Sequence, residues 1–401
     1  MTNELLDVVF EGGGARGLAL TGAVAELETR SFAFGRLVGT SAGAITATLI
    51  AAGYRGKALR DVGLERLPSG ASRMTTFLEE PGRFSEADIL HSTLGGVIAE
   101  VLDPFLPAAL ERPIEVGTLR AMLHFPPFAR LFNLVEHGGL YSADGFLAWL
   151  DQCLDARAPG TSELTLARFH ASTGFDLSLV ASDTTATRML VLNHRTAPEL
   201  PLRWAVRMSM SIPFVWPEVV WDASWGNYLG RSITGHVILD GGLISNFALR
   251  LLVSDAPWIT EIMGGPPDPQ RCILSLALDE SLPVDPGKVR KAPKSLQEKT
   301  IGRIERVFDT ATGGNDTTEQ DVYQRLVCRL PTGGYGTLEF DMRVPQIARL
   351  MDAGAQAVDA WLATRHGVLH RVHEARALMS TDFGRTLLWG SADEPAKVAA
   401  E

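Results

Sequence analysis

Two tandem units of strand, glycine-rich turn and helix at the N-terminus constrain the fold more than any other feature of this sequence. The first unit has an apolar run at 6–10 and a helical repeat at 18–30. The second has a strand-like run at 34–38 and small, helix-forming residues at 44–52. Because parallel neighbouring strands need a crossover connection, usually a helix, the two units predict an α/β fold with a mainly parallel sheet.

The remaining chain adds further strands and helices. Residues 54–170 combine several prolines with helical fragments, so we expect a mostly helical insertion over one side of the sheet. Residues 283–294, rich in proline and basic side chains, are expected to form an exposed loop. Strand signals recur at 176–181, 188–193, 237–239 and 272–278, and helical signals at 202–210, 296–312, 320–329 and 344–363.

Hydrophobic content and charge narrow the class of protein. Hydrophobic residues make up 46% of the 401 residues, which predicts a folded, water-soluble body. The 37 Lys and Arg residues against 47 Asp and Glu residues give a net charge of −10, which argues against a nucleic-acid-binding protein. We therefore expect no nucleic-acid partner.

Three further features concern the cellular compartment. Acidic residues among the first seven positions do not fit the basic start of an export signal. The longest apolar stretch, 42–53, is far shorter than the roughly 20 residues that cross a bilayer. Cys153, Cys272 and Cys328 have no metal-ligand spacing and are expected to be buried free thiols. We expect a cytoplasmic protein with, at most, peripheral contact with a membrane.

A glycine cluster, Gly12-Gly13-Gly14-Ala15-Arg16-Gly17, lies between the first strand and the first helix. Without Cβ atoms, several backbone N–H groups can turn toward one point, where the helix N-terminus adds positive potential. The spacing also fits a dinucleotide-binding fingerprint, but that fingerprint needs an acidic residue about 20 positions later, and residues 36–39 contain none. The cluster alone indicates either an anion site or a tight turn.

The second turn, Gly39-Thr40-Ser41-Ala42-Gly43, has the pattern G-x-S-x-G at a strand-to-helix junction. A serine on such a turn is held out at the carboxyl end of the strand, and its small neighbours allow a substrate to approach. The pattern also occurs by chance. The glycine cluster one unit earlier favours Ser41 as a nucleophile, because its N–H groups would face the oxyanion that forms when serine attacks a carbonyl.

A serine nucleophile needs a base, and the sequence favours an aspartate over a histidine. Asp240 ends an apolar strand at the turn Gly241-Gly242, where we expect an exposed carboxylate at the carboxyl end of the sheet; alternatively, Asp240 only caps the turn. None of the nine histidines has a convincing position. His366, His370 and His373 share helical spacing, but we expect a solvated helix face there and no metal site.

Taken together, these motifs resemble the patatin-like phospholipases, a family with a three-layer α/β/α sandwich and a Ser–Asp catalytic dyad. The marks of that family are a glycine-rich oxyanion loop with an arginine, a G-x-S-x-G elbow and a D-G-G or D-G-A turn. All three occur here in family order. Further stretches similar to the family are 181–184, 210–217, 241–246, an expected closing strand at 338–340 and helix residues 353–354.

The resemblance implies a role for each matching residue. Ser41 is implied to be the nucleophile and Asp240 the general base, and no metal or organic cofactor is required. The N–H groups of Gly13, Gly14 and Ala15 are implied to form the oxyanion hole, and Arg16 to orient that loop. The implied site also includes Gly12, Gly17, Gly39, Thr40, Ala42, Gly43, Gly241 and Gly242.

The function implied by the resemblance is that of a serine acyl hydrolase acting on phospholipids or related acyl esters. The implied domain spans 7–365, with the helical cap at 54–170 inserted in it and a C-terminal helical extension at 366–401. Aromatic residues at 125–132 and at Trp221, Trp225 and Tyr228 form either a mouth that contacts lipid or a packed core. The alternative function is a catalytically degenerate lipid- or partner-binding scaffold. The presence of both dyad residues argues against this alternative.

Overall fold

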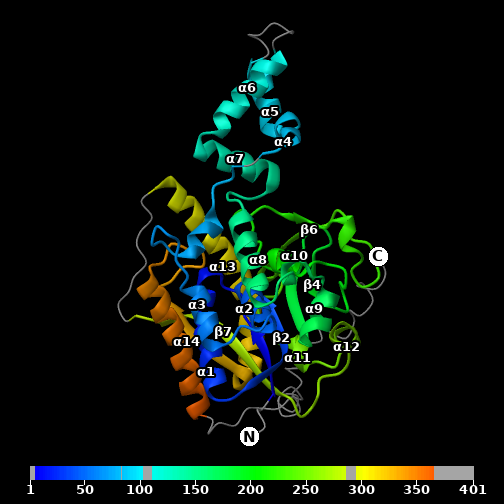
Figure 1. Ribbon diagram of the computed structural model, residues 1–401, viewed down its shortest axis with the longest axis vertical. Coiled ribbons are helices and arrows are strands. Elements are labelled where there is room, and N and C mark those ends of the chain that lie inside the picture. Colours follow the sequence, from blue (N-terminus) through cyan, green and yellow to red (C-terminus); the bar gives the residue numbers. More distant parts are fainter. Residues whose placement is uncertain (1–4, 83, 103–110, 286–294, 365–401) are drawn as a thin grey trace.

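The computed structural model describes residues 5–82, 84–102, 111–285 and 295–364. Helices and strands of this part of the chain form an α/β body, from which a helical arm projects at the top of Figure 1. The expected C-terminal extension at 366–401, including His366, His370 and His373, lies outside the described residues, as does most of the expected loop at 283–294.

The central sheet is mainly parallel, as the tandem units predict. Five strands in the order β3-β2-β1-β7-β8 run parallel, whereas β4, β5 and β6 are antiparallel to the strands with which they pair. The strands are β1 (Leu5–Phe10), β2 (Ala33–Thr40), β3 (Leu177–Asp183), β4 (Arg188–Leu192), β5 (Val219–Val220), β6 (Val237–Asp240), β7 (Cys272–Pro283) and β8 (Val327–Gly333).

Helices cover both faces of this sheet. Leu6, Val8 and Phe10 of β1 pack into one core, and Val9 of the same strand packs into a second core on the opposite face. Strands buried on both faces are typical of parallel sheets between two helix layers. The predicted three-layer α/β/α sandwich is therefore confirmed.

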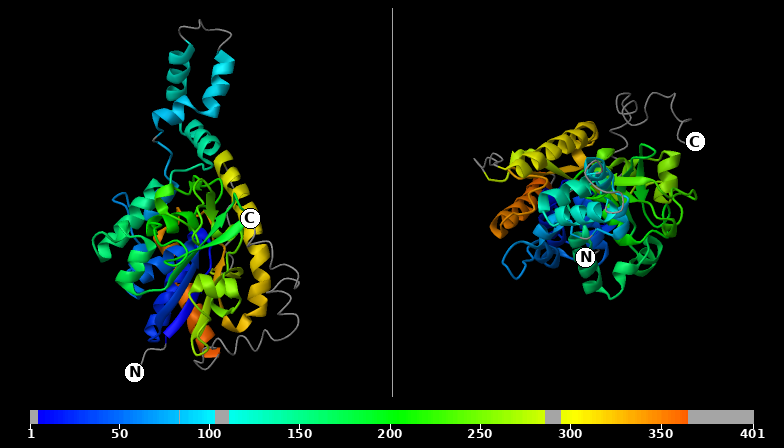
Figure 2. Two further views of the ribbon diagram at one scale, coloured as in Figure 1. Left: turned by 90° about the vertical axis from the view of Figure 1, so that its right-hand side faces the viewer. Right: turned by 90° about the horizontal axis from the view of Figure 1, so that it is seen from above.

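The first core is covered mainly by α1 (Leu18–Thr29), α2 (Ala42–Ala51), α3 (Gly56–Gly63), α8 (Asp144–Arg157), α9 (Leu166–Thr173), α10 (Leu202–Ser209) and α14 (Val344–Thr364). The second core is covered by α11 (Arg250–Val253) and α12 (Pro257–Met263). The long helix α13 (Leu296–Val322) runs along the side of the body (Figure 2). The arm consists of α4 (Glu86–Leu90), α5 (Thr93–Leu102), α6 (Glu111–Leu123) and α7 (Pro126–His137).

Two expected elements are wrong. Residues 320–329 contain the end of α13, the 3₁₀ turn η7 (Gln324–Leu326) and the start of β8, because pairing with the edge of β7 outweighs the local helical spacing. Residues 338–340, expected as a strand, form a turn. The Phe340 ring packs edge-on against Phe77 and Trp216, so its apolar character serves a core contact and not a sheet.

Helices α1 and α14 lie side by side (Figure 1) because glycines allow their backbones to approach. A Cβ atom at Gly22 would overlap the Met351 carbonyl, and one at Gly354 would overlap the Ala19 carbonyl. By contrast, Gly96 in α5 is exposed, and a Cβ there would have no atom within 4 Å.

We predict that Gly22→Ala lowers the free energy of unfolding by about 1–3 kcal/mol, because the two helices must move apart to admit the methyl group. The matched control Gly96→Ala should leave it unchanged or raise it by up to about 1 kcal/mol, because alanine is the better helix former. Urea denaturation followed by circular dichroism measures both values. Equal effects of the two substitutions would contradict the prediction.

Candidate active site

Ser41 occupies a strained backbone position between β2 and α2. Its φ of 52° and ψ of −120° lie in a region that non-glycine residues rarely adopt. The Ser41 N–H donates to Ser209 Oγ at 3.0 Å, and the Ser209 hydroxyl donates to the Val180 carbonyl at 2.6 Å. The elbow is therefore fixed to the end of α10 and, through it, to β3.

The glycines that flank Ser41 permit the crowding of this turn. A Cβ atom at Gly43 would overlap the Phe10 carbonyl at the end of β1, and one at Gly39 would overlap the Gly43 carbonyl. Thr40 is buried, and Ala42 begins α2. Small residues therefore allow the first turn of α2 to lie against β1, as the pattern predicts.

The glycine loop lies directly beside the elbow. A Cβ atom at Gly12 would be 3.0 Å from the Cβ of Ser41, and one at Gly17 would overlap the Cβ of Ala42. Residues Gly14–Gly17 form the 3₁₀ turn η1, in which Gly14 has a φ of 55° and lies against the Thr337 carbonyl. The two glycine-rich turns predicted from the sequence are thus in contact.

The hydrogen bonds of this loop correct the expected set of oxyanion donors. The Ala15 N–H donates to the Thr337 carbonyl at 2.8 Å, and the Gly12 N–H donates to the Asn246 carbonyl at 3.4 Å. Neither is free to bind an oxyanion, so the role expected of Ala15 is wrong for this conformation. Within the described residues, the N–H groups of Gly13 and Gly14 have no acceptor and are the donors that remain.

Arg16 ties the glycine loop to its surroundings. Its guanidinium group bonds to Glu280 at the end of β7 and to Asp309 of α13 at 3.1 Å, and its Nε donates to the Gly13 carbonyl at 3.4 Å. The side chain therefore holds the loop from outside and does not reach into the site.

Asp240 reaches Ser41 by a route that differs from the expected one. β6 runs antiparallel to β3, and its last residue, Asp240, pairs with Ala181. The neighbouring residue Val180 pairs with Thr40, so β3 extends beyond the end of β2 and β6 returns alongside it. Asp240 therefore lies level with the elbow at the end of β2, although β6 approaches it from the opposite direction. The expected exposure is also wrong, because Asp240 is fully buried.

Burial dominates the electrostatics of Asp240. It raises the pKa of the carboxyl group to about 7, because the charged form loses its hydration; the nearby Ser41 hydroxyl and the Gly242 N–H act in the opposite direction. Oδ1 accepts a hydrogen bond from the Gly242 N–H at 2.8 Å. Among the described residues, Oδ2 has no partner with full hydrogen-bond geometry, so it is available to accept a proton.

Two residues that support the site were not identified as functional from the sequence. Ser209 holds the elbow, as described above. Asn246 links the two halves of the site: its Nδ2 donates to the Gly12 carbonyl at 3.2 Å and to Glu11 at 3.3 Å, and its Oδ1 lies close to where a Cβ of Gly242 would be. Asn246 could have been identified from the sequence, because it ends the stretch 241–246 that is similar to the family.

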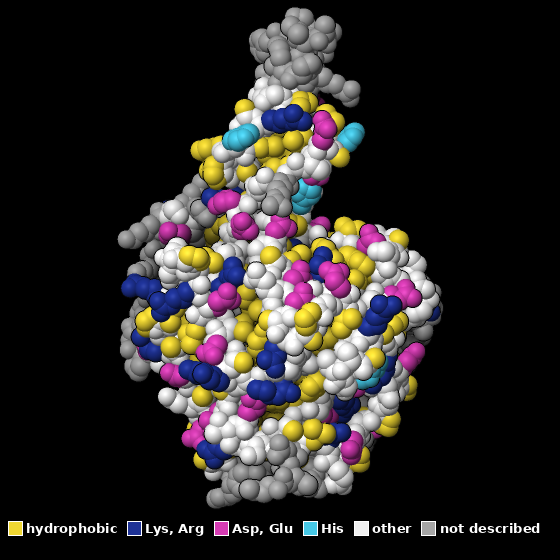
Figure 3. Space-filling view, in the orientation of Figure 1, with side chains coloured by type: hydrophobic (Ala, Val, Ile, Leu, Met, Phe, Trp, Pro, Cys, Tyr) yellow, Lys and Arg dark blue, Asp and Glu magenta, His cyan; other side chains and the backbone are white. Residues whose placement is uncertain are grey.

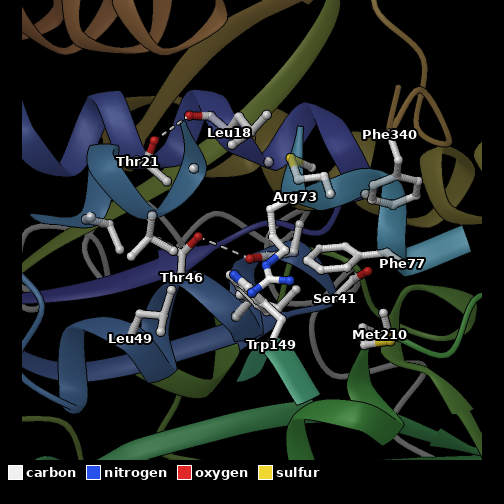
Figure 4. A pocket seen from close by; sticks show the side chains of 18 of the residues that line it. Leu18, Thr21, Ser41, Thr46, Leu49, Arg73, Phe77, Trp149, Met210 and Phe340 are labelled. Atoms are coloured by element: carbon white, nitrogen blue, oxygen red, sulfur yellow. Dashed lines mark hydrogen bonds between the residues drawn. The ribbon is translucent and has the colours of Figure 1, made fainter. Parts of the chain in front are cut away.

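An apolar channel opens beside Ser41. It has a volume of about 740 Å³, including its open mouth, and runs along one face of α2 from Ser41 past Ile45 to Leu49. This distance along the helix is roughly 12 Å. Figure 4 shows Ser41 at one end, near Phe77 and Met210, and Leu49 and Thr21 at the other.

Two threonines in the channel present little polarity to it. The Thr46 hydroxyl donates to the Ala42 carbonyl at 3.1 Å, and the Thr21 hydroxyl donates to the Leu18 carbonyl at 2.8 Å (Figure 4). Each hydroxyl is thus satisfied by the backbone of its own helix. Among the lining residues, Arg73 alone is charged, and it bonds to Glu65 and Gln152. The channel suits a hydrocarbon chain.

The expected aromatic mouth is divided between surface and core. Trp221, Trp225 and Tyr228 are buried, and the two tryptophan rings pack edge to face, which supports the packed-core alternative for them. Phe125, in contrast, is 64% exposed and Leu131 46%. Exposed apolar side chains also gather on the arm in Figure 3.

Other expectations concern thiols, metals and membrane spans. The three cysteines are buried and form no disulfide with one another, as predicted. The described residues contain no cluster of three or more His, Cys, Asp or Glu side chains that would hold a metal ion. None of the described helices combines the length and the apolar character needed to cross a bilayer.

The sequence matches the family described as patatin-like phospholipase over residues 8–253. The chain is 29% identical over 364 residues to the uncharacterized protein YqhO of Bacillus subtilis strain 168, an alignment that covers 89% of this chain and 98% of YqhO.

Solved structures with lower identity also align. VipD from Legionella pneumophila is 17% identical with a TM-score of 0.46, and covers 89% of this chain. ExoU from Pseudomonas aeruginosa, in its complex with SpcU, is 18% identical with a TM-score of 0.39, and covers 96%. This chain spans 66% of the VipD chain and 57% of the ExoU chain.

We predict that Asp240→Asn stabilises the protein at alkaline pH. The pKa of this carboxyl group is raised from 3.8 to about 7 on folding. The stability contributed by the neutral acid is therefore fully present below pH 3.8 and is lost as the pH rises through about 7. At pH 8 the wild type holds a buried charge that asparagine avoids.

The gain in unfolding free energy from Asp240→Asn should grow by about 1–3 kcal/mol between pH 5 and pH 8. Urea denaturation of both proteins at the two pH values measures it. A difference that does not change with pH would show that the Asp240 carboxyl group titrates normally.

Proposed function

This chain belongs to the patatin-like phospholipase family, and we propose that it cleaves acyl esters with Ser41 as the nucleophile and Asp240 as the general base. Membership of the family makes the protein a lipid acyl hydrolase in general terms. One observation carries the assignment of residues: a strained serine lies beside a buried carboxyl group, an apolar channel and two backbone N–H groups that have no acceptor among the described residues.

The proposed reaction begins when Asp240 removes the proton of the Ser41 hydroxyl as Ser41 Oγ attacks the ester carbonyl. The N–H groups of Gly13 and Gly14 stabilise the negative oxygen of the tetrahedral intermediate. The intermediate collapses, and the alcohol leaves with the proton that Asp240 returns. An acyl-enzyme on Ser41 remains.

Water then completes the cycle. Asp240 accepts a proton from water, the hydroxide attacks the acyl-enzyme carbonyl, and the proton passes back to Ser41 as the fatty acid leaves. The pKa of about 7 suits this double role, because a carboxyl group that titrates near neutral pH is both a stronger base than an ordinary carboxylate and a usable acid. In each step of this scheme, Asp240 accepts the proton and then returns it.

The apolar channel supports a lipid substrate. Its position along α2 suits the hydrocarbon tail of the acyl group that is attached to Ser41 in the intermediate. Exposed Phe125 and Leu131 on the arm suit peripheral contact with a membrane, where such substrates reside. Phospholipids and related acyl esters are therefore the substrate class that we propose.

We predict that Ser41→Ala reduces turnover of a short p-nitrophenyl ester on the order of 10³-fold or more, and that Asp240→Asn causes a loss of similar size. The matched control is Ser275→Ala. Ser275 is buried in β7, and its hydroxyl has no hydrogen-bond partner among the described residues, so turnover should not change. Circular dichroism verifies that the variants are folded.

A fluorophosphonate probe distinguishes an enzyme from a degenerate scaffold. The probe should label the wild type and the Ser275→Ala variant, and fail to label Ser41→Ala. Absence of labelling in the wild type, or full activity of the folded Ser41→Ala variant, would overturn the assignment.

We predict that Thr46→Phe shifts the preference of the enzyme toward shorter acyl chains, because the ring would fill the middle of the channel. Turnover of a decanoate ester should fall about tenfold or more relative to an acetate ester. Thr46→Val is the matched control. It keeps the size of the side chain and removes only a hydroxyl that bonds to its own helix.

Measuring kcat/KM across a series of p-nitrophenyl esters tests this shift. An unchanged ratio of decanoate to acetate turnover in Thr46→Phe would show that the acyl tail does not lie in the channel.

A further inference from the structure

A second cavity lies next to the wall of the apolar channel. Trp216 lines the channel, whereas the next residue, Pro217, lines this cavity. Its volume is about 840 Å³, including its open mouth. The ends of α7, α8 and α10 surround it, together with residues that precede α4 and follow Trp216. The proposed cleavage of esters makes no use of it.

Arg207 is a buried cation in the wall of this cavity. The residue is only 3% exposed, and its guanidinium group donates to two neutral oxygens: the Ser211 hydroxyl and, at 2.8 Å, the Pro217 carbonyl. Within the described part of the chain, Arg207 forms no ion pair. Burying a charge that forms no ion pair is costly, so a cavity wall with such a cation is suited to an anionic ligand.

Arginine binds phosphate and carboxylate groups well because its planar donors match their oxygens. Burial lowers the pKa of Arg207 to about 9, and the Asp144 carboxylate acts in the opposite direction. The guanidinium group therefore remains charged at neutral pH, and it is close enough to Asp144 for their charges to interact.

Among the described lining residues, two carboxylates carry the opposite charge. Asp144, at the start of α8, and Glu218 are exposed residues that line the same space. They disfavour a ligand that carries only negative charge and favour one with a positive group directed toward solvent. The described lining thus combines a buried cation with two exposed carboxylates.

Aromatic rings form part of the lining as well. Trp204 lies one helical turn before Arg207 on α10, and its ring packs 5.3 Å from that of Trp225. Phe84 lines the cavity from the segment before α4. Aromatic faces attract ammonium groups, particularly quaternary ones.

We propose that this cavity binds a zwitterionic phosphate ester, with the phosphate at Arg207 and the ammonium group near Asp144, Glu218 and the tryptophan rings. Phosphocholine is a small molecule with this chemistry and a quaternary ammonium group, and it occurs both as a free solute and as a lipid head group. The site is separate from Ser41, so it exists whether or not the proposed cleavage is correct.

Isothermal titration calorimetry on the full chain with Ser41→Ala, which prevents hydrolysis, tests the site. Free phosphocholine should bind with higher affinity than inorganic phosphate. Adding Arg207→Gln should weaken phosphocholine binding about tenfold or more. Unchanged binding in a folded Arg207→Gln protein, or no binding of phosphocholine at millimolar concentration to the parent protein, would overturn the proposal.

Asp144→Asn provides a second test that does not disturb a buried group. Removing this carboxylate should strengthen binding of inorganic phosphate and weaken binding of phosphocholine, each by about threefold. The opposite signs distinguish a zwitterion site from general electrostatics. Changes of the same sign for both ligands would overturn the proposed arrangement of charges.

The source of the ligand is resolved with dihexanoyl phosphatidylcholine below its micelle concentration. Affinity at least tenfold higher for this lipid than for free phosphocholine would identify the site as one for a lipid head group. Equal affinities would identify it as a site for a free solute.

Discussion

The burial of Asp240 beside the elbow is the constraint on which the rest of this site depends. A carboxyl group without access to water binds its proton more tightly, and in this position it lies beside Ser41, the proposed nucleophile. A base that titrates near neutral pH is usually a histidine, whose ordinary pKa already lies in that range. Here an aspartate has a pKa in that range because β6, which returns antiparallel to β3, ends inside the protein and buries Asp240.

Close packing of backbone is the second requirement, and it explains why small residues recur through the site. The elbow, the glycine loop and the Asp turn contact each other with little space for side chains: a Cβ at Gly12 would meet Ser41, and one at Gly241 would overlap the Val180 carbonyl. This packing leaves the N–H groups of Gly13 and Gly14 unpaired within the described residues. Strain at Ser41 is sustained by the same contacts.

The sequence predicted the parts of the fold that depend on local patterns. Strand, turn and helix at 6–52 follow from apolar runs and glycines, and the Ser41 and Asp240 turns follow from motifs. The direction of β6 did not follow, because a four-residue apolar strand has the same pattern in either direction. The Ala15 hydrogen bond did not follow either, since its acceptor, Thr337, is more than 300 positions away.

One segment connects the two cavities, and its hydrogen bonds link their chemistry. Ser211 accepts a hydrogen bond from the Arg207 guanidinium group through its hydroxyl, and its carbonyl accepts one from the N–H of Asp240 at 2.9 Å. Two positions earlier, Ser209 holds the backbone of Ser41. Residues 207–211 therefore position both proposed catalytic residues while anchoring the buried cation.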